Sequence, residues 1–360
     1  MSIDSEVRRI RKALSSVQGH RVAAPPITLV TGPRIEIAAG DPDQPFYVAS
    51  IDKVFLATLT GQLFDEGRFE LDTPLGRLLP REDIAPLPAM AGVDNARDIT
   101  VEHLLSHTSG LPDVMLPPRG HDTSCSIANL LADPGRVWTV REFLAQAESL
   151  PPFARPGEKF LYGDTSYLLL TRILEEARDA PIDQQLRTRV FQPAEMEDTA
   201  SWAGASSERL NTLLPTLAPL WLHGDERVPQ EFAPNLTWQN GLGGPSTAND
   251  LVRFQRRLHA GDLCDPKWVR LFGSPRNKLR PGIHYGTGMA ALRFGGFSPF
   301  MRGYPQPTGG LGYTATHMFY YPDHKTHVVL SYHSHRRMQA SFRMHIRIAG
   351  LIHRHGQPVQ

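Results

Sequence analysis

A serine and a lysine stand three residues apart at the start of an apolar segment, in the tetrapeptide Ser50-Ile51-Asp52-Lys53. The residues that follow are mostly apolar, so the segment is expected to form a helix. Side chains three residues apart share a helix face. A serine hydroxyl becomes a useful nucleophile when a neighbour takes its proton, and a partly buried, neutral lysine can be that base. Alone, the tetrapeptide is weak evidence, because Ser-x-x-Lys occurs by chance in many chains.

Three later blocks extend the pattern in a fixed order. They are ITVEHLLSHTSGLPD at residues 99–113, PGE followed by YGDTSY within residues 156–167, and GGPSTANDL at residues 243–251. Together with the tetrapeptide, these blocks resemble the serine hydrolases of the class C β-lactamase and DD-peptidase group, which includes the β-lactamase-like carboxylesterases. The resemblance covers roughly residues 27 to 333 and is specific because it is ordered and long.

The resemblance implies a mixed α/β (α+β) fold of the β-lactamase and penicillin-binding-protein type, with an antiparallel sheet flanked by helices and a mostly helical domain beside it. We expect residues 1–69 and 241–360 to form the sheet domain, discontinuous in sequence, and residues 70–240 to form the helical domain. A length of 360 residues suits two such parts. The active site would lie between them, as ligand sites commonly do.

Hydrophobic periodicity and turn-forming residues such as glycine and proline predict the individual strands and helices. Strands are predicted at 27–30, 35–38, 286–294, 312–321 and 327–332, and helices at 139–148, 166–178, 246–258 and from Met338 onward. Thr139, followed three residues later by Glu142, has the spacing of a helix N-cap. Ser246 or Thr247 would cap the third of these helices.

By resemblance, Ser50 is the nucleophile, Lys53 its base or proton relay, and Tyr162 the proton carrier that serves the leaving group. A tyrosine with a pKa near 10 is a poor base unless a nearby cation stabilises its phenolate, and Lys53 is the available cation. The family's Tyr-x-Asn motif ends here in Asp164. If Asp164 approaches Lys53, its charge favours the protonated amine, and Tyr162 or a water carries more of the proton transfer.

The family's third motif, a lysine or histidine followed by a small residue and glycine, has two candidate registers. Counting back from Tyr321-Pro322 favours Gly310-Leu311-Gly312, and the alternative is Pro307-Thr308-Gly309. Neither register contains a basic residue. The oxyanion would then be bound by the backbone N–H groups of Ser50 and, in the first register, Tyr313.

Loss of the basic residue bears on the substrate. It removes a group that would bind a substrate carboxylate, and a glycine in its place is expected to open space beside the nucleophile. β-Lactams and D-Ala-D-Ala peptides carry such a carboxylate, whereas an ester needs neither that contact nor a strong acid for its leaving group.

Several other residues are weaker candidates. His107 lies in a block that is a structural turn in the family, and Asp52, about 200° round the helix from Ser50, is interpreted as a solvated or packing residue. Trp238 and Tyr285 are either acyl-pocket residues or ordinary core aromatics. His333 and His335 have no third ligand at metal spacing, so neither a metal nor another cofactor is expected.

Charge and hydropathy restrict the partners and the compartment. With 38 basic and 37 acidic residues, the chain has no overall field to attract nucleic acid or an anionic membrane. Residues 1–18 contain no hydrophobic signal core, and no segment has the ~18 consecutive apolar residues of a membrane span. We therefore expect a cytoplasmic protein with a small-molecule acyl substrate.

The functional hypothesis is a serine hydrolase that forms an acyl-enzyme on Ser50, with a carboxylic ester as substrate. An acyltransferase or amidase of the same fold is the alternative, and a β-lactamase or D-peptidase ranks lower. A catalytically silent ligand-binding homologue is the alternative from a different class. It does not explain why Ser50, Lys53 and Tyr162 occur together.

Overall fold

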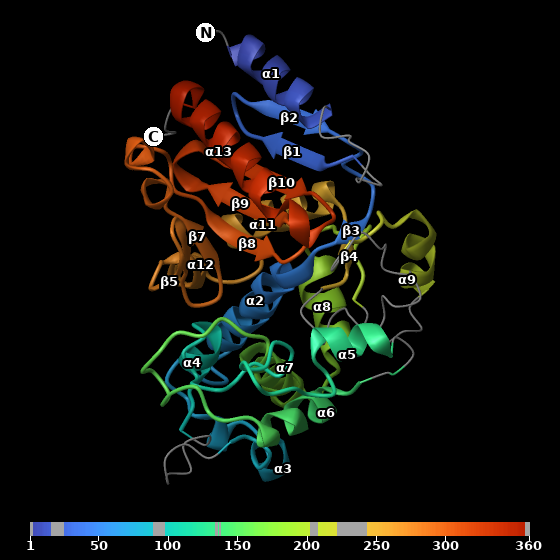
Figure 1. The fold of residues 1–360 in the computed structure, drawn as a ribbon, viewed down its shortest axis with the longest axis vertical. Coiled ribbons are helices and arrows are strands. Elements are labelled where there is room, and N and C mark those ends of the chain that lie inside the picture. The colour runs from blue at the N-terminus through green and yellow to red at the C-terminus, as the bar shows by residue number, and fades with distance from the viewer. Residues whose placement is uncertain are drawn as a thin grey trace.

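A large antiparallel sheet, formed by both ends of the chain, organises the molecule (Figure 1). The structure is a computed structural model that describes residues 3–15, 25–88, 98–133, 136, 138–201, 208–221 and 243–356. The sheet has eight strands in the order β2-β1-β10-β9-β8-β7-β6-β5. They are β1 (Ile27–Thr31), β2 (Glu36–Ala39), β5 (Asn277–Arg280), β6 (Ile283–Tyr285), β7 (Ala290–Leu292), β8 (Thr308–Gly312), β9 (Thr316–Tyr321) and β10 (Thr326–Ser331).

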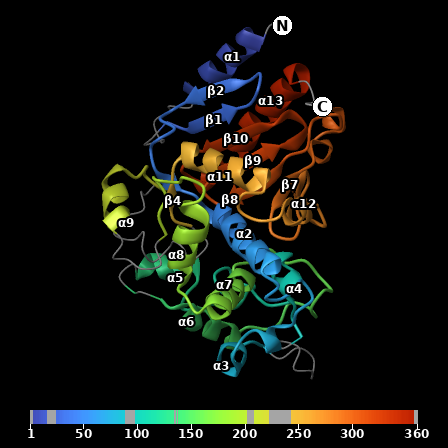
Figure 2. The ribbon, with the colours of Figure 1, turned by 180° about the vertical axis from the view of Figure 1, so that it is seen from behind.

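Alternation of side chains gives the sheet two apolar faces. In β10, Val328 and Leu330 face one core cluster and Val329 faces the other. A sheet buried on both faces is therefore covered by helices on both sides. On one face lie α1 (Ile3–Ser15) and α13 (Met338–His355), and on the other α11 (Ala248–Ala260) and α12 (Pro266–Gly273), as Figures 1 and 2 show.

The helical part lies beyond one end of the sheet and is built around α7 (Thr165–Arg178). The other helices there are α3 (Arg81–Ile84), α4 (Val101–Leu105), α5 (Ile127–Ala132), α6 (Val140–Ala145), α8 (Ile182–Leu186) and α9 (Glu208–Leu213). Helix α2 (Asp52–Asp65) runs from the sheet into this part and packs against α7. No helix in the described ranges combines the length and apolar composition needed to cross a bilayer.

Most predicted elements are present, and the errors are local. The β1–β2 hairpin, α6, α7, α11 and α13 all form, and Thr139 and Glu142 make a complete capping box. The predicted strand 312–321 is confirmed only from Thr316, where β9 begins: Gly312 ends β8, and a turn with Ala315 at φ 61° separates the two strands. The predicted strand 286–294 shortens to β7. The predicted domain boundary at residues 240 and 241 lies outside the described residues.

Candidate active site

Ser50 lies in a tight turn where the chain passes from the sheet side into α2. The short ribbon of β3 (Phe46–Tyr47) and β4 (Pro245–Ser246) leads into a 3₁₀ turn, Ala49–Ile51, which continues directly as α2. Ala49 has a left-handed φ of 51°, an unusual conformation for a residue with a side chain. Such strain persists only where the surrounding structure enforces it, and it occurs often at functional sites. The first N–H groups of a helical turn have no acceptor within the helix, so they are available to a ligand.

Lys53 is buried beside Ser50. Its Nζ lies 3.2 Å from Ser50 Oγ and 2.5 Å from Asp164 Oδ1, and only 3% of its side chain is exposed. Burial lowers the pKa of Lys53, but the charges of Asp164, Tyr162 and Asp52 more than offset this, so the pKa lies well above its ordinary value. The resting amine is therefore an ammonium. The pairing of Asp164 with Lys53 that the sequence suggested is present in the structure.

Asp164 reaches Lys53 from the N-terminus of α7. It occupies the N-cap position, yet its side chain does not cap the helix because it reaches Lys53 instead. Thr165, the next residue, accepts a hydrogen bond from the Val114 N–H at 3.0 Å and donates one to the Pro112 carbonyl at 2.8 Å. These bonds tie the start of α7 to the loop after α4, so the carboxylate is held by a rigid support.

Tyr162 completes the group. Its ring centre lies 5.6 Å from Lys53 Nζ, and its hydroxyl lies close enough to Ser50 for the serine to lower its pKa. Burial raises the pKa of Tyr162, and the Lys53 charge opposes this only in part. Tyr162 is therefore a neutral phenol at rest, which suits a group that gives a proton to the leaving group.

Aromatic side chains pack against the ring of Tyr162. The His107 ring lies 4.3 Å from the Tyr162 ring, and its Nδ1 accepts a hydrogen bond from the Gly163 N–H at 3.4 Å. Burial, and then Lys53, lowers the pKa of His107 well below its ordinary value, so it is neutral. Tyr285 is buried 5.5 Å from Tyr162 and shares a hydrogen bond with Tyr167. His107 and Tyr285 thus pack against the Tyr162 ring, while Trp238 lies outside the described residues.

Two further carboxyl groups are buried near this site. Asp52 was interpreted as a solvated or packing residue, and its burial rules out the solvated alternative, while Asp113 was not predicted. Asp52 is 3% exposed, its Oδ1 has no partner among the described residues, and burial raises its pKa to about 7. Asp113 is also buried, and burial together with the nearby Asp164 raises its pKa to about 7. The burial of Asp52 follows from α2 being apolar around its whole circumference, since between Lys53 and Asp65 it has no charged residue. That signal was available in the sequence, whereas the position of Asp113 depended on loop geometry.

The glycines of the predicted third motif lie against the Ser50 turn. A Cβ on Gly310 would approach Ile51 Cγ1 to 3.1 Å, and one on Gly312 would approach the Val48 carbonyl oxygen to 2.7 Å. The expectation that glycine opens space beside the nucleophile is therefore wrong at Gly310, because that space is filled. β7 pairs with β8 only at Thr308 and Gly309, so the later part of β8 is not paired to it. Tyr313 follows directly and is half-buried, with its ring stacked 3.9 Å from His335.

Comparisons with known proteins give the geometry a context. Penicillin-binding protein 4 of Amycolatopsis lactamdurans is 31% identical over 243 residues, which make up 64% of this chain and 55% of that protein. Monacolin J acid methylbutanoyltransferase of Aspergillus terreus is 28% identical over 166 residues, 43% of this chain and 38% of that protein. Both matches therefore span well under two thirds of the relatives' own length.

Among solved structures, D-amino acid amidase from Ochrobactrum anthropi SV3 superposes with a TM-score of 0.75 over 97% of this chain and 99% of that chain. Its sequence identity is 20%, so this likeness concerns the fold. The family model described as Beta-lactamase matches residues 36–350, a range that contains β8, Tyr162 and the whole Ser50 turn. This chain belongs to the β-lactamase family.

Proposed function

We propose that this protein is a serine hydrolase that forms an acyl-enzyme on Ser50 and hydrolyses small-molecule carboxylic esters. The observation that carries the proposal is the 3.2 Å contact between Lys53 Nζ and Ser50 Oγ in a buried site. A nucleophile within hydrogen-bonding reach of a proton acceptor, which is itself held by a third group, is the arrangement that covalent catalysis requires. Asp164 is that third group.

The resting protonation states define the proton route. Because Lys53 is an ammonium, it must first pass a proton to the Asp164 carboxylate across their 2.5 Å contact. The neutral amine then takes the proton of Ser50 as Oγ bonds to the ester carbonyl carbon. Tyr162 gives its phenolic proton to the departing alkoxide, and Lys53 returns a proton to Tyr162. The ester C–O bond breaks, the acyl–Ser50 bond forms, and water reverses these steps to release the acid.

The choice of an ester rests on what the site contains. Neither register of the third motif supplies a cation to bind a substrate carboxylate. Among the described residues of the buried cluster, the cation Lys53 is already paired with Asp164 and also lies near Asp52. Lys53 is therefore not free to bind a substrate carboxylate, which counts against β-lactams and D-Ala-D-Ala peptides.

Acyl transfer to an alcohol or amine is the second candidate. It is favoured by the match to a methylbutanoyltransferase, and it uses the same acyl-enzyme with another acceptor in place of water. An amidase acting on a neutral amide is the third form of this chemistry.

Labelling with a fluorophosphonate, followed by intact-mass measurement, tests the proposal. We expect a single adduct on the native protein and none on Ser50→Ala. A folded native protein that takes no adduct and hydrolyses no short-chain activated ester would refute catalysis and favour a ligand-binding role. If the adduct forms, turnover of nitrophenyl esters with and without an added alcohol separates hydrolysis from transfer. Rapid turnover of a chromogenic cephalosporin would overturn the choice of an ester.

A further inference from the structure

The surface formed by α1 and α13 is strongly basic, although the chain as a whole is nearly neutral. Helix α1 carries four basic and two acidic side chains, and α13 carries three arginines and no acidic residue. The two helices thus carry five net positive charges, while the whole chain carries one, so the remainder is net negative by four. No acidic residue occurs after Asp323. The overall balance, on which the expectation of no membrane partner depended, hides this separation.

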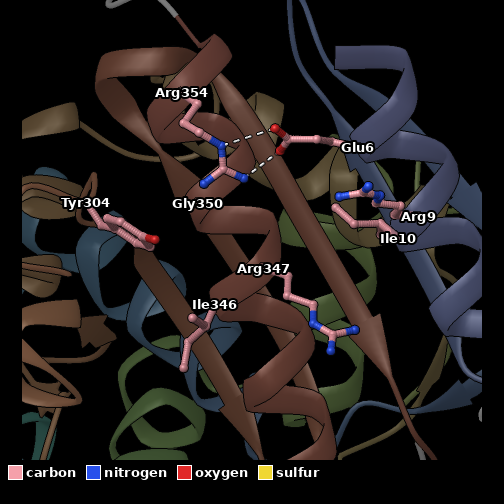
Figure 3. Close-up of a pocket in the computed structure, with 8 residues that line it drawn as sticks. All are labelled: Glu6, Arg9, Ile10, Tyr304, Ile346, Arg347, Gly350 and Arg354. Carbon is pink, nitrogen blue, oxygen red and sulfur yellow. Dashed lines mark hydrogen bonds and ion pairs between the residues drawn. The ribbon is translucent and has the colours of Figure 1, made fainter. Parts of the chain in front are cut away.

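The arginines of α13 face solvent in one stripe. Arg343, Arg347 and Arg354 are four and then seven residues apart, so they share a helix face, and all three are exposed. Arg354 forms an ion pair with Glu6 of α1 at 2.5 Å, which joins the two helices (Figure 3). Arg9 and Arg347 form no ion pair with any residue that the structure describes. Their charges are therefore available to an external anion.

An apolar depression lies between these charges. Its volume is about 750 Å³, and it is lined by Ile10, Tyr304, Ile346 and Gly350 together with Arg9, Arg347, Glu6 and Arg354 (Figure 3). Arginines beside an apolar floor suit a ligand that carries a negative group and a hydrocarbon part. The depression lies on the α13 face of the sheet, and α2 leaves the sheet toward the helical part, so the depression is separate from the Ser50 site.

A fully exposed aromatic residue lies in the segment that flanks α13. Phe300 is 96% exposed. It lies between Phe297, whose ring packs 5.7 Å from Phe342 of α13, and Tyr304, which stacks 5.1 Å from His353 of the same helix. An exposed phenylalanine beside a basic, partly apolar helix face is the combination found on proteins that bind the interface of an anionic membrane.

We propose that the α1/α13 face binds the surface of an anionic phospholipid bilayer. Arg9, Arg343 and Arg347 contact lipid phosphates, the apolar depression takes part of an acyl chain, and Phe300 inserts at the level of the headgroups. A second copy of the chain is disfavoured as occupant because two such faces repel each other. A nucleic acid would use the arginines but leave the apolar depression and Phe300 without a role. The protein would then dock reversibly, since no helix in the described ranges spans the bilayer.

Co-sedimentation of the full chain with vesicles tests this inference. We expect binding to vesicles of phosphatidylcholine that contain about 30% phosphatidylglycerol, weak binding to pure phosphatidylcholine, and a large loss when salt rises from about 0.1 to 0.5 M. The double variant Arg9→Glu/Arg347→Glu should lower the partition coefficient by at least about 30-fold. Phe300→Ser should lower it by about tenfold, in a manner that salt changes little.

The matched control is Arg187→Glu/Arg270→Glu, which changes the net charge equally. Arg187 lies in the helical part and Arg270 on α12, on the opposite side of the sheet. The control should bind vesicles like the native protein, and all variants should keep their melting temperature and turnover of a soluble ester.

Three outcomes would overturn the inference: no binding to anionic vesicles, binding that the Arg9/Arg347 variant retains, or equal loss in the control. Binding of monomeric dodecyl phosphate without binding to vesicles would mean that the ligand of this face is a free amphiphile and not a bilayer. Dimerisation that the Arg9/Arg347 variant abolishes would replace it with a second copy.

Discussion

Two buried polar clusters, one under α13 and one around Ser50, differ in charge and in how completely their hydrogen bonds are paired. Under α13, Tyr321, His345, His317 and Ser341 form a chain of hydrogen bonds of 2.8–3.0 Å. Ser341 donates to the Met338 carbonyl, so it accepts from His317 Nε2, and His345 Nδ1 must donate to His317 Nδ1. Tyr321 then donates to His345 Nε2. Each hydrogen-bonding side-chain atom of these four residues has a partner, and none of the four side chains carries a charge.

The Ser50 cluster is charged and incompletely paired. Lys53 is paired with Asp164 and lies near Asp52, and Asp113 lies near Asp164. One oxygen of Asp52 has no partner in the described structure. A neutral, fully paired network stabilises one arrangement, because any proton added or removed breaks a bond. A cluster with more carboxyl groups than cations can exchange protons within itself. The comparison indicates that the first cluster serves the fold and the second serves chemistry.

Removing the cation should have the largest effect. Lys53→Met is expected to lower kcat/KM for an ester by about 10²- to 10⁴-fold, because Lys53 is the group that contacts Ser50 Oγ and would take its proton. Steady-state kinetics measure this loss, and fluorophosphonate labelling should slow in parallel. Lys267→Met, at an exposed lysine, is the control and should leave both rates unchanged. Native-like rates in Lys53→Met would remove Lys53 from the mechanism.

Asp52→Asn should stabilise the protein in a pH-dependent way. Burial raises the pKa of folded Asp52 to about 7, above its unfolded value, so its ionisation costs stability once the pH exceeds the unfolded pKa. The variant should gain up to about 4 kcal/mol in unfolding free energy at pH 8, and the gain should vanish below about pH 4. Urea denaturation at several pH values measures it. A gain that does not vary with pH would contradict the raised pKa.

Asp164→Asn should move the pH dependence of catalysis. Asp164 is the nearest of the groups that raise the pKa of Lys53, so its loss makes the neutral amine available at lower pH. We expect the low-pH limb of kcat/KM, where activity rises as Lys53 loses its proton, to shift down by about one to three pH units, while Asp164→Glu retains the native profile. An unmoved limb in Asp164→Asn would mean that the pair does not control the proton route.

A substitution in the neutral network under α13 should change the free energy of unfolding but not catalysis, and this is the smallest of the expected effects. Ser341→Ala leaves His317 Nε2–H buried without an acceptor and should cost about 1–3 kcal/mol of unfolding free energy, with unchanged ester turnover. Burial lowers the pKa of His345 to about 3, so its share of stability is present above the unfolded pKa near 6.5 and is lost as the pH falls below it.

Nitrogen NMR of the imidazoles checks the direction of the network. We expect a protonated Nε2 on His317 and a protonated Nδ1 on His345. The opposite tautomers, or an imidazolium at pH 6, would invalidate the comparison between the two clusters.

The proximity of Ser50, Lys53, Tyr162 and Asp164 was predicted from the sequence, and the neutral network was not. Ser50 and Lys53 are local in sequence, and Tyr162 and Asp164 lie in a motif, so spacing alone indicated their proximity. His317 and His345 come from a strand and a helix, and only their packing unites them. Asp113 was missed for the same reason. β8 was misplaced because Thr-Gly-Gly-Leu-Gly has low strand propensity, although the close packing of its glycines explains that composition.

The glycines around the Ser50 turn also limit how this protein can be engineered. Replacing glycine by alanine is a common way to stabilise a protein, because it restricts the unfolded chain. Added methyl groups at Gly243, Gly310 or Gly312 would press on the backbone or side chains of residues 48–54, the segment that holds the nucleophile. Directed evolution for heat tolerance would therefore find its gains far from this turn. Sequence libraries that randomise these three positions would consist mostly of inactive members.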